Sequence, residues 1–204
     1  MHRQSFSMKI FILFFAFSIS LFATTISESL LQIHATLMPK VYLMDYSYKE
    51  KIDNNSIVIA IAYNKVDYSS AQSLKEKIEA KYRDGIKSYS IDVKLVPYSQ
   101  VDKNSANIYY LFPTNSKNIK KVIKKANEDN ALTFSYLKDD LQHGIMISVS
   151  IGNRVKPILN LNAIKLHNIS FRPVLLNISK IYSSTLSSML YLEYKKSICN
   201  GVYT

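Results

Sequence analysis

The chain has 204 residues, of which 48% are hydrophobic and 20% charged, and this balance suits one globular domain that buries a core without a metal or disulfide. The formal net charge of +11 usually indicates an anionic partner. Cys199 is the only cysteine, which excludes an intramolecular disulfide, and only four glycines are available to build a phosphate-binding loop.

The N-terminus has the pattern of a signal peptide. Arg3 and Lys9 precede an apolar run from Ile10 to Phe22, and Ala23 is a small residue suited to cleavage. The run is too short to span a bilayer comfortably, and no later segment is apolar and long enough to anchor the chain. We therefore expect an exported protein that does not span the membrane after cleavage and that has no nucleic-acid partner.

The first helix of the mature chain is predicted from Ile26 to Met44, where apolar residues recur at steps of three and four. Pro39 lies within it and predicts a kink or break between Met38 and Lys40, because proline removes one backbone hydrogen bond and crowds the preceding turn. The helix is apolar over more than one face. Either a partner covers the second face, or the same domain covers the helix on two sides.

The first strand and helix follow directly. Ser56 to Tyr63 reads SIVIAIAY, a continuous run rich in β-branched residues that is typical of a strand covered on both faces. Ser69 or Ser70 is expected to cap a helix that runs through Tyr82 to the turn at Asp84-Gly85. A second strand is predicted over Ser90 to Val96, which completes one strand-helix-strand unit.

A second cycle repeats this pattern. We predict a strand over Asn107 to Phe112, a cap at Thr114 or Asn115, a helix with an apolar stripe around Val122, and a strand over Ala131 to Tyr136. Strands that alternate with helices favour a mainly parallel sheet with helices packed on it.

The pattern changes after Gly144. Two extended runs, Ile145 to Ile151 and Val155 to Leu161, predict a β-hairpin. A helical turn over Ala163 to Leu166 is expected next, closed by Asn168 in a left-handed conformation. Pro173 then begins a final helix that extends to about Ser184.

These elements predict an α/β fold: a single domain with a mixed, mostly parallel sheet flanked by helices, ending in a C-terminal β-hairpin and a closing helix. The domain is assigned to residues 24–184, after a signal peptide over residues 1–23. Residues 185–204 form a C-terminal tail without a clear boundary signal.

The sequence offers little that suggests catalysis. It contains no dinucleotide-binding, P-loop, nucleophile-elbow or zinc-protease motif, and the histidines do not lie at metal-ligand spacing. Asp139-Asp140 stands close to His143, which allows a metal or general-base site, or simply a solvated turn. An enzyme would need these three side chains to converge on a buried pocket.

A row of lysines marks the second predicted crossover helix. Most of them lie on the side away from its apolar stripe, where they form either a surface for anionic lipid or an acidic partner, or an ordinary solvated face. The row consists of Lys117, Lys120, Lys121, Lys124 and Lys125.

Four segments of the C-terminal half, in this order, resemble the YfiR-like family, a domain of unknown function. They are ALTFS (Ala131–Ser135), GIMI (Gly144–Ile147), PILNLNAI (Pro157–Ile164) and ISFRPVLLNISKIY (Ile169–Tyr182). They are similar to the strand, the glycine that opens a hairpin, the N-L-x-A step and the closing helix of that family. With the N-terminal helix, the resemblance covers about residues 27–184. The Trp-Pro step and the cysteines of some members are absent.

The resemblance implies a periplasmic, non-enzymatic regulator in cyclic-di-GMP or related signalling. Such a protein binds an inner-membrane diguanylate cyclase or sensor kinase and holds its output down, without a metal or cofactor. The contact would come from the closing helix and from the first helix through Leu31, His34, Met38 and Tyr42. The structural motif would comprise Gly144, Asn160, Asn162 and Pro173, with both asparagines bracing the corner between hairpin and helix. A homodimer is left open.

A second hypothesis is a periplasmic small-ligand-binding protein that serves uptake or sensing. Its support is the alternation of strands and helices, because open α/β sheets bind ligands at the ends of their strands. A ligand bound between two lobes would favour it. An enzyme is the third hypothesis.

Overall fold

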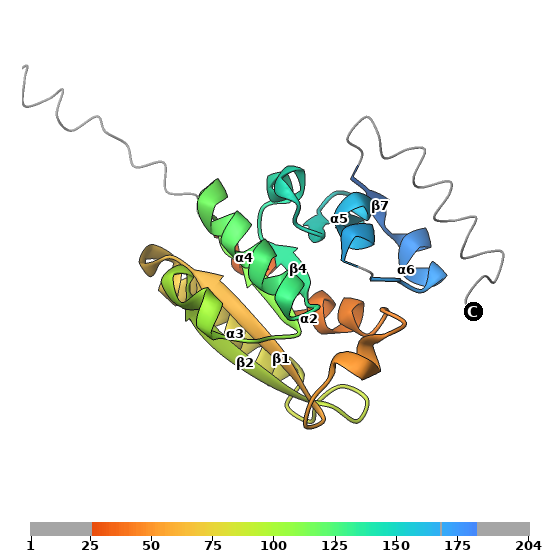
Figure 1. Ribbon diagram of the computed structural model, residues 1–204, viewed down its shortest axis with the longest axis horizontal. Coiled ribbons are helices and arrows are strands. Elements are labelled where there is room, and N and C mark those ends of the chain that lie inside the picture. Colours follow the sequence, from red (N-terminus) through yellow and green to blue (C-terminus); the bar gives the residue numbers. More distant parts are fainter. Residues whose placement is uncertain (1–25, 168, 183–204) are drawn as a thin grey trace, which may run out of the picture.

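The computed structural model describes residues 26–167 and 169–182. Within these residues, seven strands form one sheet in the order β2-β1-β3-β4-β5-β6-β7 (Figure 1). The strands are β1 (Ser56–Tyr63), β2 (Ser90–Pro97), β3 (Ile108–Leu111), β4 (Leu132–Ser135), β5 (Ile147–Ser150), β6 (Lys156–Leu159) and β7 (Lys180–Ile181).

The described residues also contain five α-helices and four short 3-10 helices, of which α2 and η1 precede the first strand. The α-helices are α2 (Glu28–Tyr42), α3 (Tyr68–Lys81), α4 (Ser116–Glu128), α5 (Leu161–Leu166) and α6 (Pro173–Ile178). The 3-10 helices are η1 (Tyr48–Lys51), η2 (Lys65–Asp67), η3 (Tyr98–Lys103) and η4 (Lys138–His143).

The sheet is mixed and mostly parallel, as predicted. Strands β2, β1, β3, β4 and β5 run parallel, so their carboxyl ends meet at one edge, here called the carboxyl edge. Strand β6 is antiparallel to β5, which confirms the hairpin, and β7 is parallel to β6. The opposite edge, where β1 to β5 begin and where β6 and β7 end, is here called the amino edge.

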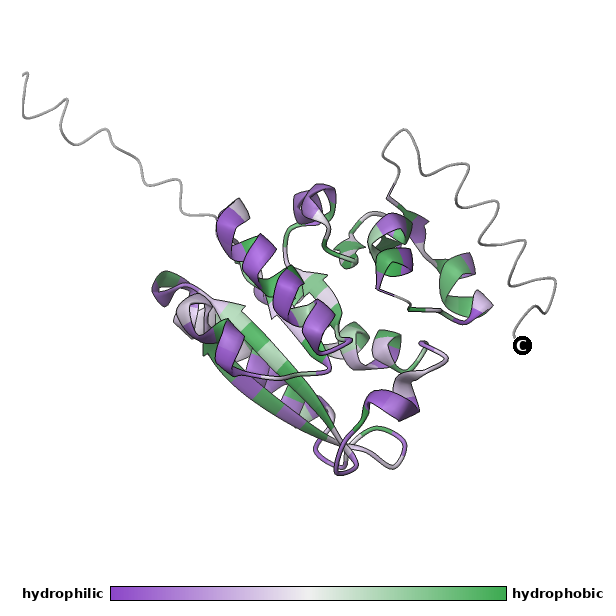
Figure 2. Ribbon diagram, in the orientation of Figure 1, coloured by the Kyte–Doolittle hydropathy of each residue, from purple (hydrophilic) through white to green (hydrophobic). Residues whose placement is uncertain are grey.

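Helices cover both faces of the sheet. Side chains of β1 alternate between the two layers: Ile59 and Ile61 join the core under α2 and α3, whereas Ala60 and Ala62 join the core under α4. Figure 2 shows α4 as alternating hydrophilic and hydrophobic bands, as expected of a helix with one face on the sheet. Two covered faces explain why β1 is apolar at consecutive positions.

A kink or break was predicted near Pro39; helix α2 runs without interruption through Pro39 to Tyr42, so a break is wrong. Ser27 caps the helix, and the Leu43 amide donates to the Pro39 carbonyl at its end. Pro39 is buried together with Met38 and Val41 on the core side. Packing of this apolar turn against the sheet therefore holds the helix together despite the missing proline amide.

Helix α3 begins earlier than the predicted serine caps. Helix η2 leads directly into Tyr68, and Asp67 takes the N-cap position, so Ser69 and Ser70 lie in the first turn. The helix ends at Lys81, and Gly85 follows with a φ of +77°. A Cβ at Gly85 would collide with the Tyr89 carbonyl, which explains the glycine in this turn.

The closing helix is shorter than predicted. Helix α6 ends at Ile178, and Ser179 is extended, with its hydroxyl donating to the Leu175 carbonyl at 2.6 Å. The chain then adds β7 beside β6, so the helix predicted to extend to Ser184 gives way to an edge strand. Three expectations concern residues outside the described ones: the signal peptide, the turn at Asn168, and the tail with Cys199.

The described residues contain no helix with both the length and the apolar character needed to cross a membrane.

Candidate functional site

The four side chains of α2 expected to meet a partner are buried against the sheet. Their exposed fractions are between 0 and 1%, and they are Leu31, His34, Met38 and Tyr42. In this conformation they cannot touch a partner, so direct contact through them disagrees with the structure. The other interpretation describes α2 better, because the same domain covers it on two sides.

His34 is the most unusual of these side chains. Its Nδ1 lies 2.7 Å from the Tyr110 hydroxyl, and its ring packs edge-on against Tyr110, Phe134 and Tyr136. Its Nε2 is buried and has no hydrogen-bond partner in the described chain. Burial lowers the pKa of His34 to about 3, because the apolar surroundings penalise the imidazolium. The side chain is therefore a neutral link between α2 and the sheet.

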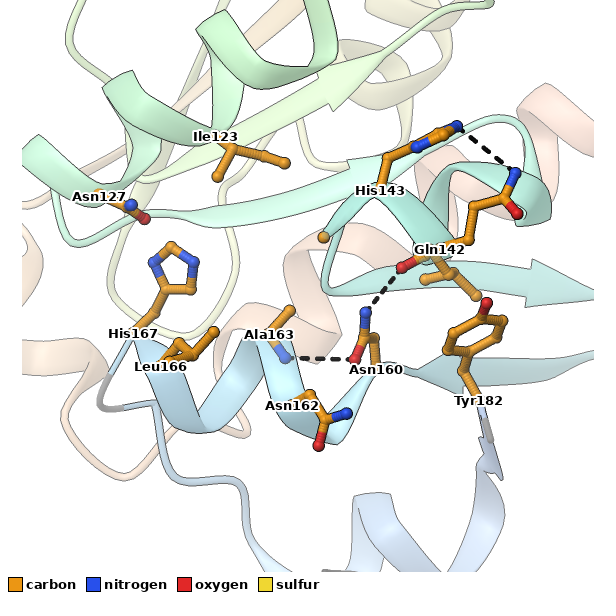
Figure 3. Close-up of a pocket in the computed structure, with 12 residues that line it drawn as sticks. Ile123, Asn127, Gln142, His143, Asn160, Asn162, Ala163, Leu166, His167 and Tyr182 are labelled. Carbon is orange, nitrogen blue, oxygen red and sulfur yellow. Dashed lines mark hydrogen bonds between the residues drawn. The ribbon is translucent and has the colours of Figure 1, made fainter. Parts of the chain in front are cut away.

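A cavity of about 510 Å³ lies near the amino edge, where α4, η4 and α5 meet. In Figure 3, Ile123 and Asn127 come from α4, His143 from η4, and Leu166 and His167 from the end of α5. Its other lining residues are Leu141, Gln142, Gly144, Asn160, Asn162, Ala163 and Tyr182. Amides, imidazoles and apolar groups line this cavity, and none of its lining side chains is an acid, a lysine or an arginine.

Gly144 sets how closely two walls of this cavity approach. It ends η4 with a φ of +100°, a left-handed conformation that favours glycine. A Cβ at this position would lie 3.2 Å from Cδ1 of Ile123. The glycine thus turns the chain toward β5 and lets η4 pack tightly on α4.

Asn160 braces the corner between β6 and α5. Its Oδ1 accepts from the Ala163 amide at 3.2 Å, and its Nδ2 donates to the Leu141 carbonyl at 2.7 Å (Figure 3). Asn160 thereby caps α5 and ties it to η4. The side chain makes the backbone hydrogen bonds that the sequence suggests for this corner.

Asn162 differs from Asn160, because its Oδ1 is buried without a hydrogen-bond partner among the described residues. Pro173, the last residue of the predicted motif, is the first residue of α6 and is exposed. Three of the four motif residues thus line the cavity, and Pro173 does not. The sequence did not indicate a cavity here.

Asp139, Asp140 and His143 do not converge on a pocket. Asp140 is buried and accepts from the Ser135 hydroxyl, and burial raises the pKa of its carboxyl group. Asp139 is exposed, and of the three only His143 lines the cavity. No group of three or more metal-binding side chains occurs in the part of the chain that the structure describes.

The lysines of α4 fall into two groups. Lys121 pairs with Asp102 at 2.9 Å, and Lys125 pairs with Asp129 at 2.7 Å. The others are exposed and make no ion pair with any described residue: Lys117, Lys120 and Lys124. Two of the five lysines are thus structural, and three leave their charge on the surface.

Sequence reasoning missed Asp45, which connects the N-terminal and C-terminal segments of the described domain. Its side chain is buried, accepts from Lys51 Nζ at 2.7 Å, and accepts from the Ser170 amide at 3.4 Å. Its backbone bridges to Phe171. The segment after α2 is thereby joined to the segment before α6.

Comparison with known proteins gives one family and several structures of similar fold. A model of the YfiR/HmsC-like family matches residues 49–180. No curated protein matches the chain. One similar structure is a conserved domain protein from Vibrio cholerae O1 biovar eltor, with 12% sequence identity and a TM-score of 0.55. Another is the ABC domain in complex with L-Trp from Streptococcus pneumonia, with 9% sequence identity and a TM-score of 0.53.

Each alignment covers 75% of this chain and 60% of the other. This chain thus spans less than two thirds of either structure, and at these identities the similarity is one of fold alone.

Proposed function

The chain belongs to the YfiR/HmsC-like family, and on that premise we propose that it is a periplasmic, non-enzymatic regulator that binds and represses an inner-membrane diguanylate cyclase or sensor kinase. The family match over residues 49–180 carries this proposal. The apolar run from Ile10 to Phe22 supports export.

Repression of this kind is a shift of population. The partner has an active and an inactive state, and the regulator must bind the inactive state more tightly, since equal affinity for both states shifts nothing. The regulator needs no chemistry of its own. The separation of Asp139, Asp140 and His143 is consistent with such a role.

We place the partner contact on the exposed side of α6. Val174 and Ile178 lie one turn apart, and each side chain is 54% exposed although both are apolar. Their neighbours Leu175 and Leu176 are buried, so α6 is fixed to the core while its outer side stays open. An exposed apolar pair on a fixed helix suits a contact with the partner's periplasmic domain.

The test is recovery of a partner from detergent-solubilised membranes of the source organism. The exported chain is expected to retain one signalling membrane protein, and a Val174→Asp, Ile178→Asp variant to lose it. An Ala80→Asp, Ser88→Asp variant, with the same added charge at exposed positions elsewhere, is the control and should retain the partner. Recovery of no signalling protein, or equal loss in both variants, would contradict the proposal.

The cavity at α4, η4 and α5 favours binding of a small ligand as a second function. Its volume of about 510 Å³ suits a small molecule, and its amide and imidazole groups suit an uncharged polar one. One of the similar structures contains L-Trp, which is a property of that protein. The cavity lies at the amino edge, whereas ligands of open α/β sheets usually bind at the carboxyl ends of strands.

A ligand screen by thermal shift tests this second function. A ligand of the cavity should raise the melting temperature of the exported chain, and a bulky Ala163→Phe substitution in the wall should abolish the shift. A shift that persists in the substituted chain would place the ligand elsewhere.

A further inference from the structure

The carboxyl edge of the sheet gathers exposed apolar side chains that the proposed function does not use. After β1, Val66 is 88% and Tyr68 is 51% exposed, and in the hairpin turn after β5, Ile151 is 58% and Val155 is 43% exposed. Because β1, β3, β4 and β5 run parallel, these two loops lie along the same edge, separated by three strand intervals of about 4.8 Å each.

Basic side chains accompany them. Lys65 precedes Val66, Lys117 and Lys120 lie in the first two turns of α4 after β3, Lys138 follows β4, and Arg154 is in the hairpin turn. All five are exposed, and none makes an ion pair with a described residue.

The acidic side chains in the same loops are fewer. Asp67 is half-buried, Asp139 is exposed, and Asp140 is buried beneath the Ser135 hydroxyl. These loops thus carry five exposed basic groups and two accessible carboxylates. Glu28 at the start of α2 is also exposed, but it pairs with Lys77 at 2.9 Å, so the charge of this edge is net positive.

The N-terminal end of α2 lies at this edge. The Ser27 amide, at the start of α2, donates to the hydroxyl of Tyr136, which directly follows β4. Only residues 23–25 separate Phe22, the end of the apolar run, from Ile26. The start of α2 therefore lies at the same edge of the sheet as the loop after β4.

We propose that the carboxyl edge is a membrane-docking surface that binds anionic phospholipid headgroups through Lys65, Lys117 and Arg154. Val66 and Ile151 insert between the headgroups from the two loops. Basic groups contribute about a fivefold gain in affinity each near an anionic membrane, and exposed apolar side chains add to it. This surface is separate from the partner contact on α6 and would hold the regulator beside a membrane-bound partner.

The test is sedimentation of the exported chain, purified from the periplasm, with vesicles of phosphatidylglycerol and phosphatidylcholine. A Lys65→Gln, Lys117→Gln, Arg154→Gln variant is expected to bind on the order of 100-fold more weakly at low salt. A Lys40→Gln, Lys49→Gln, Lys81→Gln variant loses the same charge from exposed lysines toward the amino edge and should bind like the unmodified chain.

The apolar contribution has its own variant. Val66→Ser with Ile151→Ser is expected to weaken vesicle binding by about tenfold, because two exposed apolar side chains lose their insertion. All these positions are exposed, so the melting temperature should not change. Hydrogen exchange of the unmodified chain gives a readout independent of the variants: anionic vesicles should slow exchange at residues 64–69 and 151–155 but not at residues 48–53.

Several outcomes would overturn the proposal. They are no binding of the unmodified chain to anionic vesicles, equal loss in the two charge variants, and absence of protection at the two loops. Binding only to native inner-membrane vesicles, and not to lipid alone, would mean that the edge meets an acidic protein and would also overturn it.

Discussion

His34 makes the stability of the domain depend on pH. Its pKa is about 3 in the folded chain and about 6.5 in the unfolded chain, so the unfolded state binds more protons between these values. The folded state therefore loses stability as the pH falls from about 6.5 toward about 3. Above pH 6.5 both states carry a neutral imidazole, and His34 adds no pH dependence.

We predict that His34→Gln flattens this dependence. The glutamine amide can still hydrogen-bond to Tyr110 but does not titrate. In the unmodified chain, protonation of His34 in the unfolded state should lower the free energy of unfolding by roughly 2.5 kcal/mol between pH 7 and pH 4.5. Urea unfolding at pH 7, 5.5 and 4.5 measures the difference between the two chains. Tyr110→Phe, which removes the hydroxyl and keeps the imidazole, should retain the slope. Equal slopes for the unmodified chain and His34→Gln would contradict the prediction.

Asn160 and Asn162 stand two residues apart in the same motif, and the structure gives them different energetic roles. Asn160→Ala removes the cap of α5 and leaves the Leu141 carbonyl without its side-chain donor, at a cost of about 2 to 3 kcal/mol. Asn162→Ala removes an Oδ1 that has no partner in the described chain and should cost less than about 1 kcal/mol. Urea unfolding of both variants measures this. An equal or reversed order would show that this account of the corner is wrong.

At the scale of elements, Asp45 connects the N-terminal and C-terminal segments of the domain. Its carboxylate is almost fully buried and holds Lys51 and the Ser170 amide. Asp45→Ala leaves both donors without this acceptor, which we expect to cost about 2 to 4 kcal/mol. Hydrogen exchange should also show that α6 and β7 open before the central strands. Lys49→Ala, at an exposed position in η1, is the control and should change neither quantity.

The sequence predicted elements well where a local pattern decides them. Strand β1 was evident from SIVIAIAY, and Asn115 caps α4 as one of the two residues expected to do so. The sequence predicted elements poorly where contacts between residues distant in the chain decide the structure. Burial of the turn around Pro39 keeps α2 intact, and pairing with β6 turns residues after Ser179 into a strand instead of more helix.

At the scale of the whole molecule, the layered sheet could be predicted and the cavity could not. The sheet follows from the alternation of strands and helices. The cavity arises where residues near 123–127, 141–144 and 160–167 meet, and no local pattern in the sequence relates these segments. Burial of α2 was undecided for a similar reason: an apolar second face indicates a cover, but its source depends on how distant segments pack.

The proposed regulation of a membrane partner concerns the whole domain, and it leads to a reciprocal prediction. If the chain represses its partner tenfold by binding the inactive state, its affinity for that state must exceed its affinity for the active state by at least about tenfold, or 1.4 kcal/mol. A partner variant locked in the active state should therefore bind the exported chain at least about tenfold more weakly than a partner locked inactive. Binding to the two locked forms in detergent measures this ratio. Equal affinity for both locked forms would exclude repression by a population shift, even if the complex itself were stable.

Deletion of the gene should raise the cyclic-di-GMP level if the partner is a cyclase. The chain with Ala80→Asp, Ser88→Asp should restore repression in the deletion strain, whereas the chain with Val174→Asp, Ile178→Asp should not.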